Sequence, residues 1–282
     1  MEKTLLVFGY GYSARVLGRA LLAEGWTIYG TTRNPNEMNA LRDIGVRPVL
    51  WPGGDFGDAF ANCSHVLVSA APDADGDPVL REFAENITDM PNLKWLGYLS
   101  TIGVYGDRAG GWVDEASDLL PATKRGKLRV EAENAWRAID GLPLHIFRLA
   151  GIYGPGRGPF AKVKNGTARR IIKKDQVFSR IHVDDIASVV MASIARPNVG
   201  TVYNVCDDDA APPQDVIGYA AKLLGTEMPP AIDYDTADMT PMARSFYAES
   251  KKVRNDRIKE ELGVVLKYPT YREGLAALLD GE

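Results

Sequence analysis

The order of the expected secondary-structure elements constrains the fold of this chain more than any other feature. From Thr4 to about Leu149, short apolar runs alternate with segments of helical periodicity. Such alternation is typical of β-α-β units, in which parallel strands form one sheet with helices on its faces. The expected strands are residues 4–9, 26–30, 46–50, 65–70, 95–101 and 144–149. The sequence therefore predicts an α/β fold with a doubly wound parallel sheet.

Two proline patterns refine this prediction. Pro48 lies inside the third expected strand, and because proline has no N–H to donate to a neighbouring strand, that strand should be at an edge of the sheet. The doubly wound strand order 3-2-1-4-5-6 places the third strand at an edge as well. Asn34 and Asp77 each directly precede a proline, which predicts a helix that begins with a capping side chain and a first-turn proline.

A glycine-rich loop follows the first expected strand and precedes the first expected helix. It reads Gly9-Tyr10-Gly11-Tyr12-Ser13-Ala14 and fits the pattern G-x-G-x-x-[G/A]. The first glycine makes the tight turn, the second lets the backbone approach a pyrophosphate, and the small last residue allows close helix–strand packing. The helix N-terminus then faces the anion. This context predicts a Rossmann dinucleotide site that includes Gly9 to Ser13, with a purely structural glycine turn as the alternative.

The residues after the second strand indicate which dinucleotide is bound. An NAD site usually has Asp or Glu at this strand end to bond the ribose hydroxyls. This chain instead reads Thr31-Thr32-Arg33-Asn34. Hydroxyls and a guanidinium suit a 2′-phosphate, so Thr32 and Arg33 favour NADP over NAD. The alternative is that Arg33 is only a solvated residue before a helix cap.

Composition excludes several classes of partner. The 282 residues contain 33 Lys and Arg against 37 Asp and Glu, a net charge of −4, which offers no overall attraction for nucleic acid or an anionic membrane. No run of about 18 apolar residues occurs, and the first apolar run is too short for a signal peptide. We therefore expect a cytoplasmic protein.

Cysteine and histidine usage argues against disulfides and metal sites. Cys63 and Cys206 are too far apart in sequence for a zinc motif, and two reduced, buried thiols are expected. The three histidines, His65, His145 and His182, lie in separate elements without the spacing of metal ligands. No metal is predicted.

Four later segments carry a family resemblance. In order they are Ser-Thr-Ile-Gly-Val-Tyr-Gly-Asp from Ser100, Arg-Leu-Ala-Gly-Ile-Tyr-Gly-Pro-Gly-Arg from Arg148, Arg-Ile-His-Val-Asp-Asp-Ile from Arg180, and Tyr-Asn-Val from Tyr203. Together with the glycine loop they resemble the extended short-chain dehydrogenase/reductase superfamily, in its NAD-dependent epimerase/dehydratase-like group. The resemblance covers essentially the whole chain.

The resemblance implies a catalytic set that this chain only partly retains. Thr101 stands at the family's hydroxyl position, with Ser100 beside it, and would polarise a substrate carbonyl or hydroxyl. The family's Tyr-x-x-x-Lys pair transfers the proton. Here Arg125 occupies the Tyr position and Arg129 the Lys position, and an arginine cannot cycle a proton at neutral pH. These two arginines would instead bind an anionic substrate group or form salt bridges.

Other implied contacts surround the cofactor and the substrate. Asp55 would lie beside the adenine, and Ser69, Ala70 and Ala71 would form the small-residue turn under the riboses. The implied substrate-binding residues are Tyr105, Arg157 and Arg180. A basic stretch over residues 162–180 either binds an anionic substrate group or is a solvated surface. A homodimer through a helix over residues 124–140 is a further implication.

The only literal Tyr-x-x-x-Lys occurs elsewhere, at Tyr247 to Lys251. We interpret it as a chance match that leads a helix ending at Leu262.

These observations predict a Rossmann domain over residues 1–157, completed by 181–208, and a small substrate lobe from 158–180 and 209–282. The predicted function is that of an atypical NADP-dependent oxidoreductase or epimerase-like protein acting on a small carbonyl or hydroxyl compound. The alternative is a non-catalytic NADP(H)-binding sensor or scaffold protein. The sequence does not identify the substrate.

Overall fold

A computed structural model describes residues 3–280 of the chain. The chain separates into two compact units, and each is made of several chain segments. Unit 1 takes the described residues up to Thr101 together with Leu128–Arg148 and Ile186–Tyr203. Unit 2 takes Ile102–Lys127, Leu149–Asp185 and the described residues from Asn204 onward.

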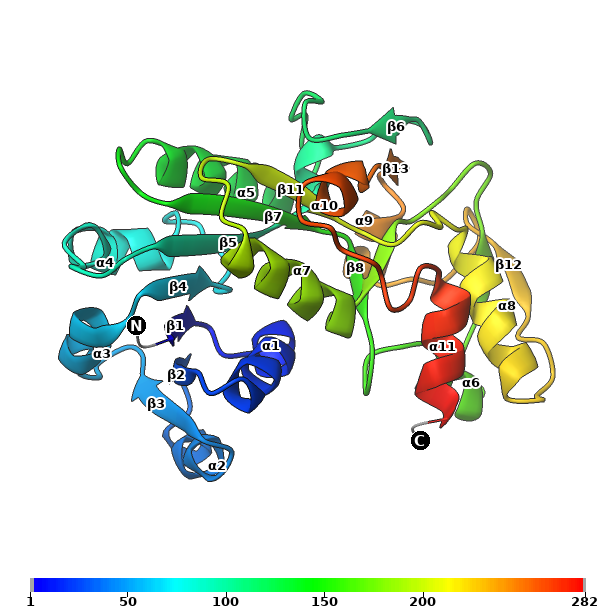
Figure 1. The fold of residues 1–282 in the computed structure, drawn as a ribbon. Coiled ribbons are helices and arrows are strands. Elements are labelled where there is room, and N and C mark those ends of the chain that lie inside the picture. The colour runs from blue at the N-terminus through cyan, green and yellow to red at the C-terminus, as the bar shows by residue number, and fades with distance from the viewer. Residues whose placement is uncertain (1–2, 281–282) are drawn as a thin grey trace. The chain divides into compact units, whose positions relative to one another are not determined.

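A seven-stranded sheet forms the framework of unit 1 and ends in the first residues of unit 2 (Figure 1). Its strand order is β11-β7-β5-β4-β1-β2-β3, which is the predicted doubly wound order with one further strand beyond β7. The strands are β1 (Thr4–Phe8), β2 (Thr27–Thr32), β3 (Val46–Leu50), β4 (His65–Val68), β5 (Trp95–Thr101), β7 (Leu144–Leu149) and β11 (Val202–Val205). The Rossmann prediction is confirmed.

The edge position of β3 is confirmed as well. Strand β3 pairs only with β2 in the described sheet, in parallel register, with Pro48 opposite Gly30. The pairs β1–β2, β1–β4 and β4–β5 are also parallel. The carboxyl ends of these strands therefore lie at one edge of the sheet, where ligands bind in open α/β folds.

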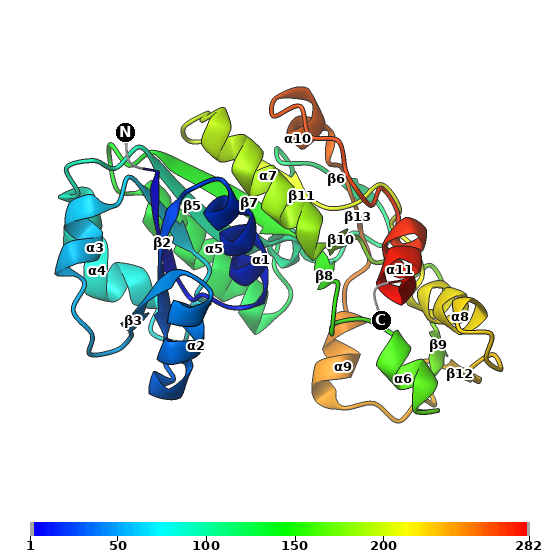
Figure 2. The same ribbon diagram turned by 60° about the horizontal axis from the view of Figure 1, so that its bottom comes forward.

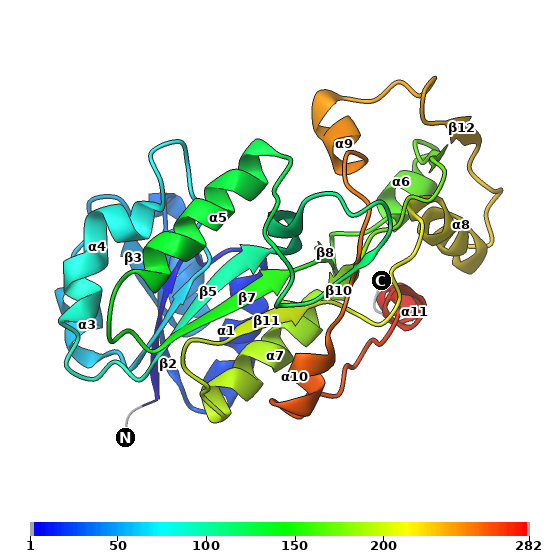
Figure 3. The same ribbon diagram turned by 90° about the horizontal axis from the view of Figure 1, so that it is seen from above.

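Helices cover both faces of the sheet in unit 1. Figure 2 and Figure 3 show α1 and α7 on one face and α3, α4 and α5 on the other. Their bounds, with the short elements between β2 and β3, are α1 (Tyr12–Ala23), η1 (Pro35–Glu37), α2 (Met38–Asp43), α3 (Gly57–Asn62), α4 (Pro78–Thr88), α5 (Lys124–Arg137) and α7 (Val183–Ala195).

The predicted helix caps are present. The Asn34 side chain accepts a hydrogen bond from the N–H of Asn36, and Asp77 Oδ1 accepts from the N–H groups of Val79 and Leu80. Each of these bonds satisfies a backbone donor that the first helical turn leaves unpaired. The α4 cap is further fixed because Asp77 Oδ2 accepts from the Trp136 indole on α5.

Unit 2 contains short strands that pair across long stretches of sequence. Three two-stranded parallel ladders join β6 to β13, β8 to β10 and β9 to β12. Their bounds are β6 (Trp112–Val113), β8 (Gly151–Tyr153), β9 (Arg170–Ile172), β10 (Arg180–His182), β12 (Ala231–Asp233) and β13 (Lys252–Val253).

Helices complete unit 2. They are η2 (Ile102–Tyr105), α6 (Phe160–Lys164), α8 (Pro213–Leu223), α9 (Pro241–Phe246), α10 (Asp256–Glu260) and α11 (Tyr271–Asp280). The main apolar cluster packs α6, α8 and α11 together through residues such as Phe160, Ala220 and Leu275. Within residues 3–280, no helix has both the length and the apolar character needed to cross a membrane.

Candidate active site

The glycine loop connects β1 to α1 in unit 1. Gly9 adopts φ +83°, a left-handed conformation that favours glycine, and its N–H donates to Thr31 Oγ1 at 2.7 Å. A Cβ at Gly9 would lie 3.0 Å from the backbone nitrogen of Ala70. Gly11 is the N-cap of α1, and no side chain among the described residues caps this helix end. The N-terminus of α1 thus carries no side-chain cap, and a helix N-terminus attracts anions.

Tyr10 is buried beneath this loop. Its ring packs against Gly18 of α1 and Gly30 of β2. A Cβ added at Gly18 would lie 2.0 Å from the Tyr10 hydroxyl, and one added at Gly30 would lie 2.8 Å from the ring, so a side chain at either position would collide with Tyr10. Burial raises the pKa of the phenol, while the neighbouring Arg15 and Arg19 lower it less. Tyr10 therefore supports the loop from below, whereas Tyr12 is partly exposed and Ser13 is buried in the first turn.

The end of β2 holds a carboxylate that sequence reasoning missed. Thr32 Oγ1 donates to Glu37 Oε2 at 3.1 Å, and Arg15 Nη2 lies 3.3 Å from the same oxygen. Glu37 lies five residues beyond Thr32, but the turn capped by Asn34 folds it back toward the strand. Arg33 is exposed beside this group. The proline-capped turn was visible in the sequence, so the return of Glu37 to the strand end could have been considered.

The other predicted cofactor residues also lie in unit 1. Asp55 is exposed, and its Oδ1 accepts from the N–H of Gly57 at the start of α3. The N–H groups of Ser69 and Ala70 both donate to Phe8 O, which fixes the end of β4 against the end of β1. Ala71 follows as an exposed residue. Small side chains here leave the backbone of this turn close to Gly9.

Ser100 belongs to a buried polar network. Its Oγ donates to Glu133 Oε1 on α5 at 2.5 Å, and the same carboxylate receives the Arg148 guanidinium of β7. All three side chains are buried. The Ser100 proton is thus held by Glu133, while Thr101, the last residue of β5, is partly exposed.

The two arginines at the family's Tyr and Lys positions have different surroundings. Arg129, in unit 1, donates from Nη1 to Leu99 O at 2.7 Å and to the Tyr98 hydroxyl at 3.0 Å, and its guanidinium lies 5.5 Å from the centre of the Tyr98 ring. Burial raises the pKa of Tyr98. Arg125, in unit 2, is exposed on the first turn of α5. Arg129 is therefore anchored to the strand that ends in Ser100 and Thr101.

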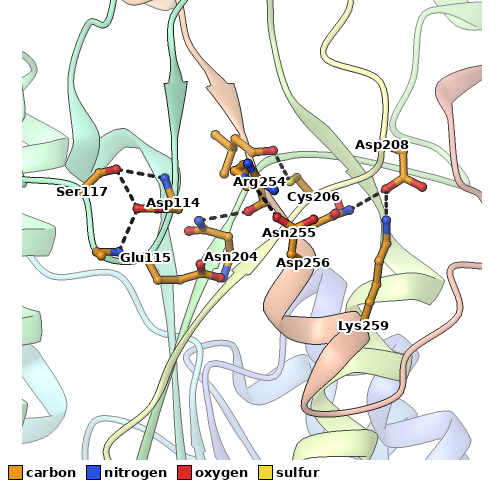
Figure 4. A network of polar contacts seen from close by, with 12 residues as sticks. Asp114, Glu115, Ser117, Asn204, Cys206, Asp208, Arg254, Asn255, Asp256 and Lys259 are labelled. Carbon is orange, nitrogen blue, oxygen red and sulfur yellow. Dashed lines mark hydrogen bonds and ion pairs between the residues drawn. The ribbon is translucent and has the colours of Figure 1, made fainter.

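The tyrosine of the Val-Tyr-Gly motif is held by hydrogen bonds in the interior of unit 2. Tyr105 is fully buried, and its hydroxyl donates to Asn204 Oδ1 at 2.7 Å. The N–H of Asn204 donates to Glu115 Oε1, and its side-chain amide donates to Arg254 O (Figure 4). Tyr105 was predicted to bind substrate, and its hydroxyl is used in this internal network.

Most of the basic stretch of unit 2 bonds to backbone carbonyls. Arg180 Nη1 donates to Phe178 O and Ala211 O, and side chains of Arg169, Arg170 and Lys173 also donate to carbonyl oxygens. Next to Arg180, burial raises the pKa of Asp207 to about 8, although the Arg180 charge lowers it. Arg157 is exposed in the turn closed by its backbone hydrogen bonds to Gly154.

The segment Tyr247 to Lys251 does not lead a helix, so that prediction is wrong. Tyr247 follows α9, and Lys251 precedes β13. Lys251 Nζ donates to Gly106 O at 2.8 Å and to Glu249 Oε2 at 2.6 Å. The N–H groups of Arg108 and Gly110 donate to Ser250 O. Tyr247 and Ala248 close a turn at the end of α9, with N–H bonds to Arg244 O and Ser245 O. The backbone of Ser250 then bonds to the loop that follows Tyr105.

Cys63 and Cys206 are buried free thiols, and burial raises the pKa of both. Within residues 3–280, no group of three or more His, Cys, Asp or Glu side chains is arranged to hold a metal ion.

Comparison with curated proteins finds full-length relatives at moderate identity, and no family model matches the chain. Protein YeeZ of Escherichia coli strain K12 is 26% identical over 280 residues, covering 95% of this chain and 97% of YeeZ. A 3-diazoavenalumate denitrifying reductase from a Streptomyces species is 26% identical over 223 residues, which cover 74% of this chain and 62% of the reductase.

Solved structures extend the comparison, and one of them has a much higher sequence identity. A conserved protein of unknown function from Silicibacter pomeroyi is 60% identical, covers 99% of both chains and has a TM-score of 0.93. A protein from Methylobacillus flagellatus, inferred to be a NAD-dependent epimerase/dehydratase, is 25% identical, covers 99% of this chain and 98% of its own, and has a TM-score of 0.74.

Two more distant structures share the fold and contain nicotinamide cofactors. The human epimerase family protein SDR39U1, solved with NADPH, is 18% identical, covers all of both chains and has a TM-score of 0.78. The dTDP-glucose 4,6-dehydratase of Bacillus anthracis, solved with NAD, is 19% identical, covers 99% of this chain and 96% of its own, and has a TM-score of 0.78.

The doubly wound sheet, the glycine loop and these neighbours define a Rossmann-fold protein of the epimerase/dehydratase type. The chain belongs to the extended short-chain dehydrogenase/reductase superfamily, as an atypical member with arginines in place of the Tyr-x-x-x-Lys pair, and it shares a family with the Silicibacter pomeroyi protein.

Proposed function

We propose that this protein binds NADP(H) and acts as an oxidoreductase or epimerase-like enzyme on a small carbonyl or hydroxyl compound. The observation that carries the proposal is the open N-terminus of α1 behind the left-handed turn at Gly9. The backbone there fits a pyrophosphate, because Gly11 leaves the first N–H groups of the helix uncapped and Gly9 and Ala70 leave no side chain in the way.

The preference for NADP rests on the groups at the end of β2. Arg33 is exposed there, and Arg15 and Thr32 both contact Glu37. A 2′-phosphate would receive charge-assisted hydrogen bonds from the two guanidinium groups. The 2′-phosphate would also compete with the Glu37 carboxylate for Arg15 and Thr32. Glu37 therefore reduces the preference for NADP over NAD.

The substrate is proposed to bind to the lobe formed by residues 158–180 and 209–282. Bound NADP(H) supplies or accepts a hydride. Thr101 is the hydroxyl at the end of β5 that would polarise the substrate oxygen, since the Ser100 proton is held by Glu133. Arg129 would hold the end of β5 in place through Leu99 O. Arg157 and Arg180 are the proposed partners of an anionic substrate group.

A paired calorimetric titration with NADPH and NADH tests the cofactor proposal. We expect NADPH to bind at least about tenfold more tightly, which corresponds to about 1.4 kcal/mol. Arg33→Ala should remove this preference. Arg42→Ala, which changes an exposed arginine bonded to Asn39 on α2, should keep it. Tighter binding of NADH would overturn the NADP assignment, and binding of neither cofactor would overturn the proposal as a whole.

One observation favours a second candidate, a non-catalytic NADP(H)-dependent sensor or scaffold protein. Neither Arg125 nor Arg129 can exchange a proton near neutral pH, and Arg129 is held by a backbone carbonyl. Absorbance of the reduced nicotinamide, followed with a panel of small aldehydes, ketones and 2-oxo acids, separates the two. Turnover by the wild-type protein that Arg129→Met abolishes supports the enzyme. Tight NADPH binding without turnover of any compound supports the sensor.

A further inference from the structure

The amino ends of four strands in unit 1 surround a cavity of about 550 Å³. Lys3 precedes β1, Trp26 precedes β2, Ser64 and His65 lead into β4, and Lys94 precedes β5. Because these strands are parallel, this edge of the sheet is opposite the one that carries the glycine loop. The cavity is therefore separate from the proposed cofactor site, and its volume is in the range of sites for small ligands, roughly 300–1,000 Å³.

The body of the cavity is apolar and partly aromatic. Leu21 near the end of α1 and Met191 and Ile194 near the end of α7 contribute aliphatic surface. The Trp26 ring meets the His65 ring edge to face, with centroids 4.8 Å apart. An aromatic side chain beside aliphatic ones favours a ligand with a ring, because rings pack well edge to face or offset against other rings.

The polar groups around the cavity are mainly hydrogen-bond donors. Trp26 is only 7% exposed, and its indole N–H has no hydrogen-bond partner among the described residues. A buried donor without a partner destabilises the fold, so an acceptor that reaches it gains binding energy. Two ammonium groups, of Lys3 and Lys94, line the cavity against the single carboxylate of Glu24.

His65 adds no charge to this set at neutral pH. Burial lowers the pKa of its imidazole to about 4, and the nearby Lys94 charge lowers it further. The net charge of the lining side chains is thus positive, and the complementary ligand is an anion.

We propose that this cavity binds a small carboxylate that carries an aromatic ring. The ring lies against Trp26 and the aliphatic side chains of α1 and α7. The carboxylate accepts a hydrogen bond from the Trp26 indole N–H and is attracted by the charge of Lys94. This site is independent of the proposed NADP(H) function and needs no catalytic step.

Calorimetric titration of the full chain with phenylacetate tests the proposal, with phenylacetamide as the neutral analogue of equal shape and hexanoate as the carboxylate without a ring. We expect phenylacetate to bind more tightly than either compound, by roughly tenfold or about 1.4 kcal/mol. Equal affinity for phenylacetate and phenylacetamide would overturn the role of the positive charge, and tighter binding of hexanoate would overturn the choice of a ring. No heat of binding with phenylacetate would overturn the site.

Two variants of the cavity lining and one control variant outside it locate the binding site. Lys94→Met should weaken phenylacetate binding about tenfold and leave phenylacetamide unchanged, whereas Lys222→Met on α8 in unit 2 should change neither. Trp26→Phe keeps a ring but removes the indole N–H, and it should weaken phenylacetate binding as well. If Trp26→Phe does not fold, the Lys94→Met and Lys222→Met pair still decides. Equal losses in these two lysine variants would overturn the assignment to this cavity.

Discussion

The guanidinium of Arg148 lies against the carboxylate of Glu133, with 2.7 Å between Nη2 and Oε2, and neither side chain is more than 3% exposed. Ser100 bonds to the same carboxylate from the neighbouring strand. This group therefore joins β5, β7 and α5 at the carboxyl edge of the sheet. A buried ion pair costs most when only one partner is removed, because the other charge is left without compensation.

We expect Glu133→Ala to lower the free energy of unfolding by about 3–5 kcal/mol, since it removes the carboxylate that compensates the buried charge of Arg148. Urea unfolding measures the loss. Asp256→Ala is the matched control, because its pair with Arg254 is exposed and should contribute at most about 1 kcal/mol. Similar losses of unfolding free energy in both variants would show that burial does not determine the cost of removing one partner of an ion pair. The double variant Glu133→Leu with Arg148→Met should recover much of the stability.

Gly9→Ala should impair both folding and cofactor binding. At φ +83° any side chain is strained by about 1–2 kcal/mol, and the new Cβ would also meet Ala70 N at 3.0 Å. Gly25→Ala is the control, because Gly25 has φ +80° and no atom within 4 Å of its added Cβ. Unfolding measurements and NADPH titrations of both variants separate the effect of backbone strain, which both share, from the steric contact with Ala70, which only Gly9→Ala makes. NADPH affinity retained in Gly9→Ala would contradict the proposed pyrophosphate loop.

Glu37→Gln should raise the preference for NADPH over NADH by several fold. The substitution keeps an oxygen near Thr32 and Arg15 but removes the negative charge that a 2′-phosphate would have to displace. Paired titrations with the two cofactors give the ratio directly. Glu24→Gln, at the C-terminal end of α1, serves as the charge-matched control. A ratio that falls or stays constant in Glu37→Gln would argue against the proposed phosphate position.

Acid should destabilise the fold partly through His65. Its pKa is about 4 in the folded chain, against 6.5 for an ordinary histidine, because burial and Lys94 oppose the charged form. The unfolded chain therefore binds the proton first. The stability contributed by neutral His65 is complete above about pH 6.5 and is lost as the pH falls toward 4. Partial solvent access limits its size to roughly 1–3 kcal/mol.

Unfolding of wild-type and His65→Gln proteins between pH 7 and about pH 4 tests this effect. The difference in unfolding free energy between them should shrink as the pH falls. His182 and Asp207 titrate in both proteins and so cancel in the comparison. A difference that is constant with pH would mean that His65 has an ordinary pKa in the folded chain.

The fold of unit 1 could be predicted because its signals are local. Pro48 marked the edge strand, Asn34 and Asp77 marked helix starts, and the glycine loop followed directly after β1. In each case one residue type has one backbone preference, and the structure places it where that preference is met. The strand order then follows from the general geometry of β-α-β units.

The parts that could not be predicted depend on contacts between distant segments. Nothing in the local sequence around Lys251 indicates that its ammonium group bonds to Gly106 O. The bonds of Ser250 O to the N–H groups of Arg108 and Gly110 likewise depend on a loop that is distant in sequence. The sequence also contains no sign that Arg180 and Lys173 donate to carbonyl oxygens, because only tertiary structure brings these oxygens near. Glu37 was missed because a turn returns it to β2.

The parallel ladders of unit 2 also determine how late in translation its strands can pair. Trp112 pairs with Lys252 in the β6–β13 ladder, and Arg170 pairs with Ala231 in the β9–β12 ladder. Such non-local pairings make folding slow, because a long loop must close before they form. While the chain emerges from the ribosome, strand β6 has no partner until nearly the whole protein has been translated. A chain truncated before residue 252 lacks this partner altogether, so the edge of β6 then stays open to pairing with other strands.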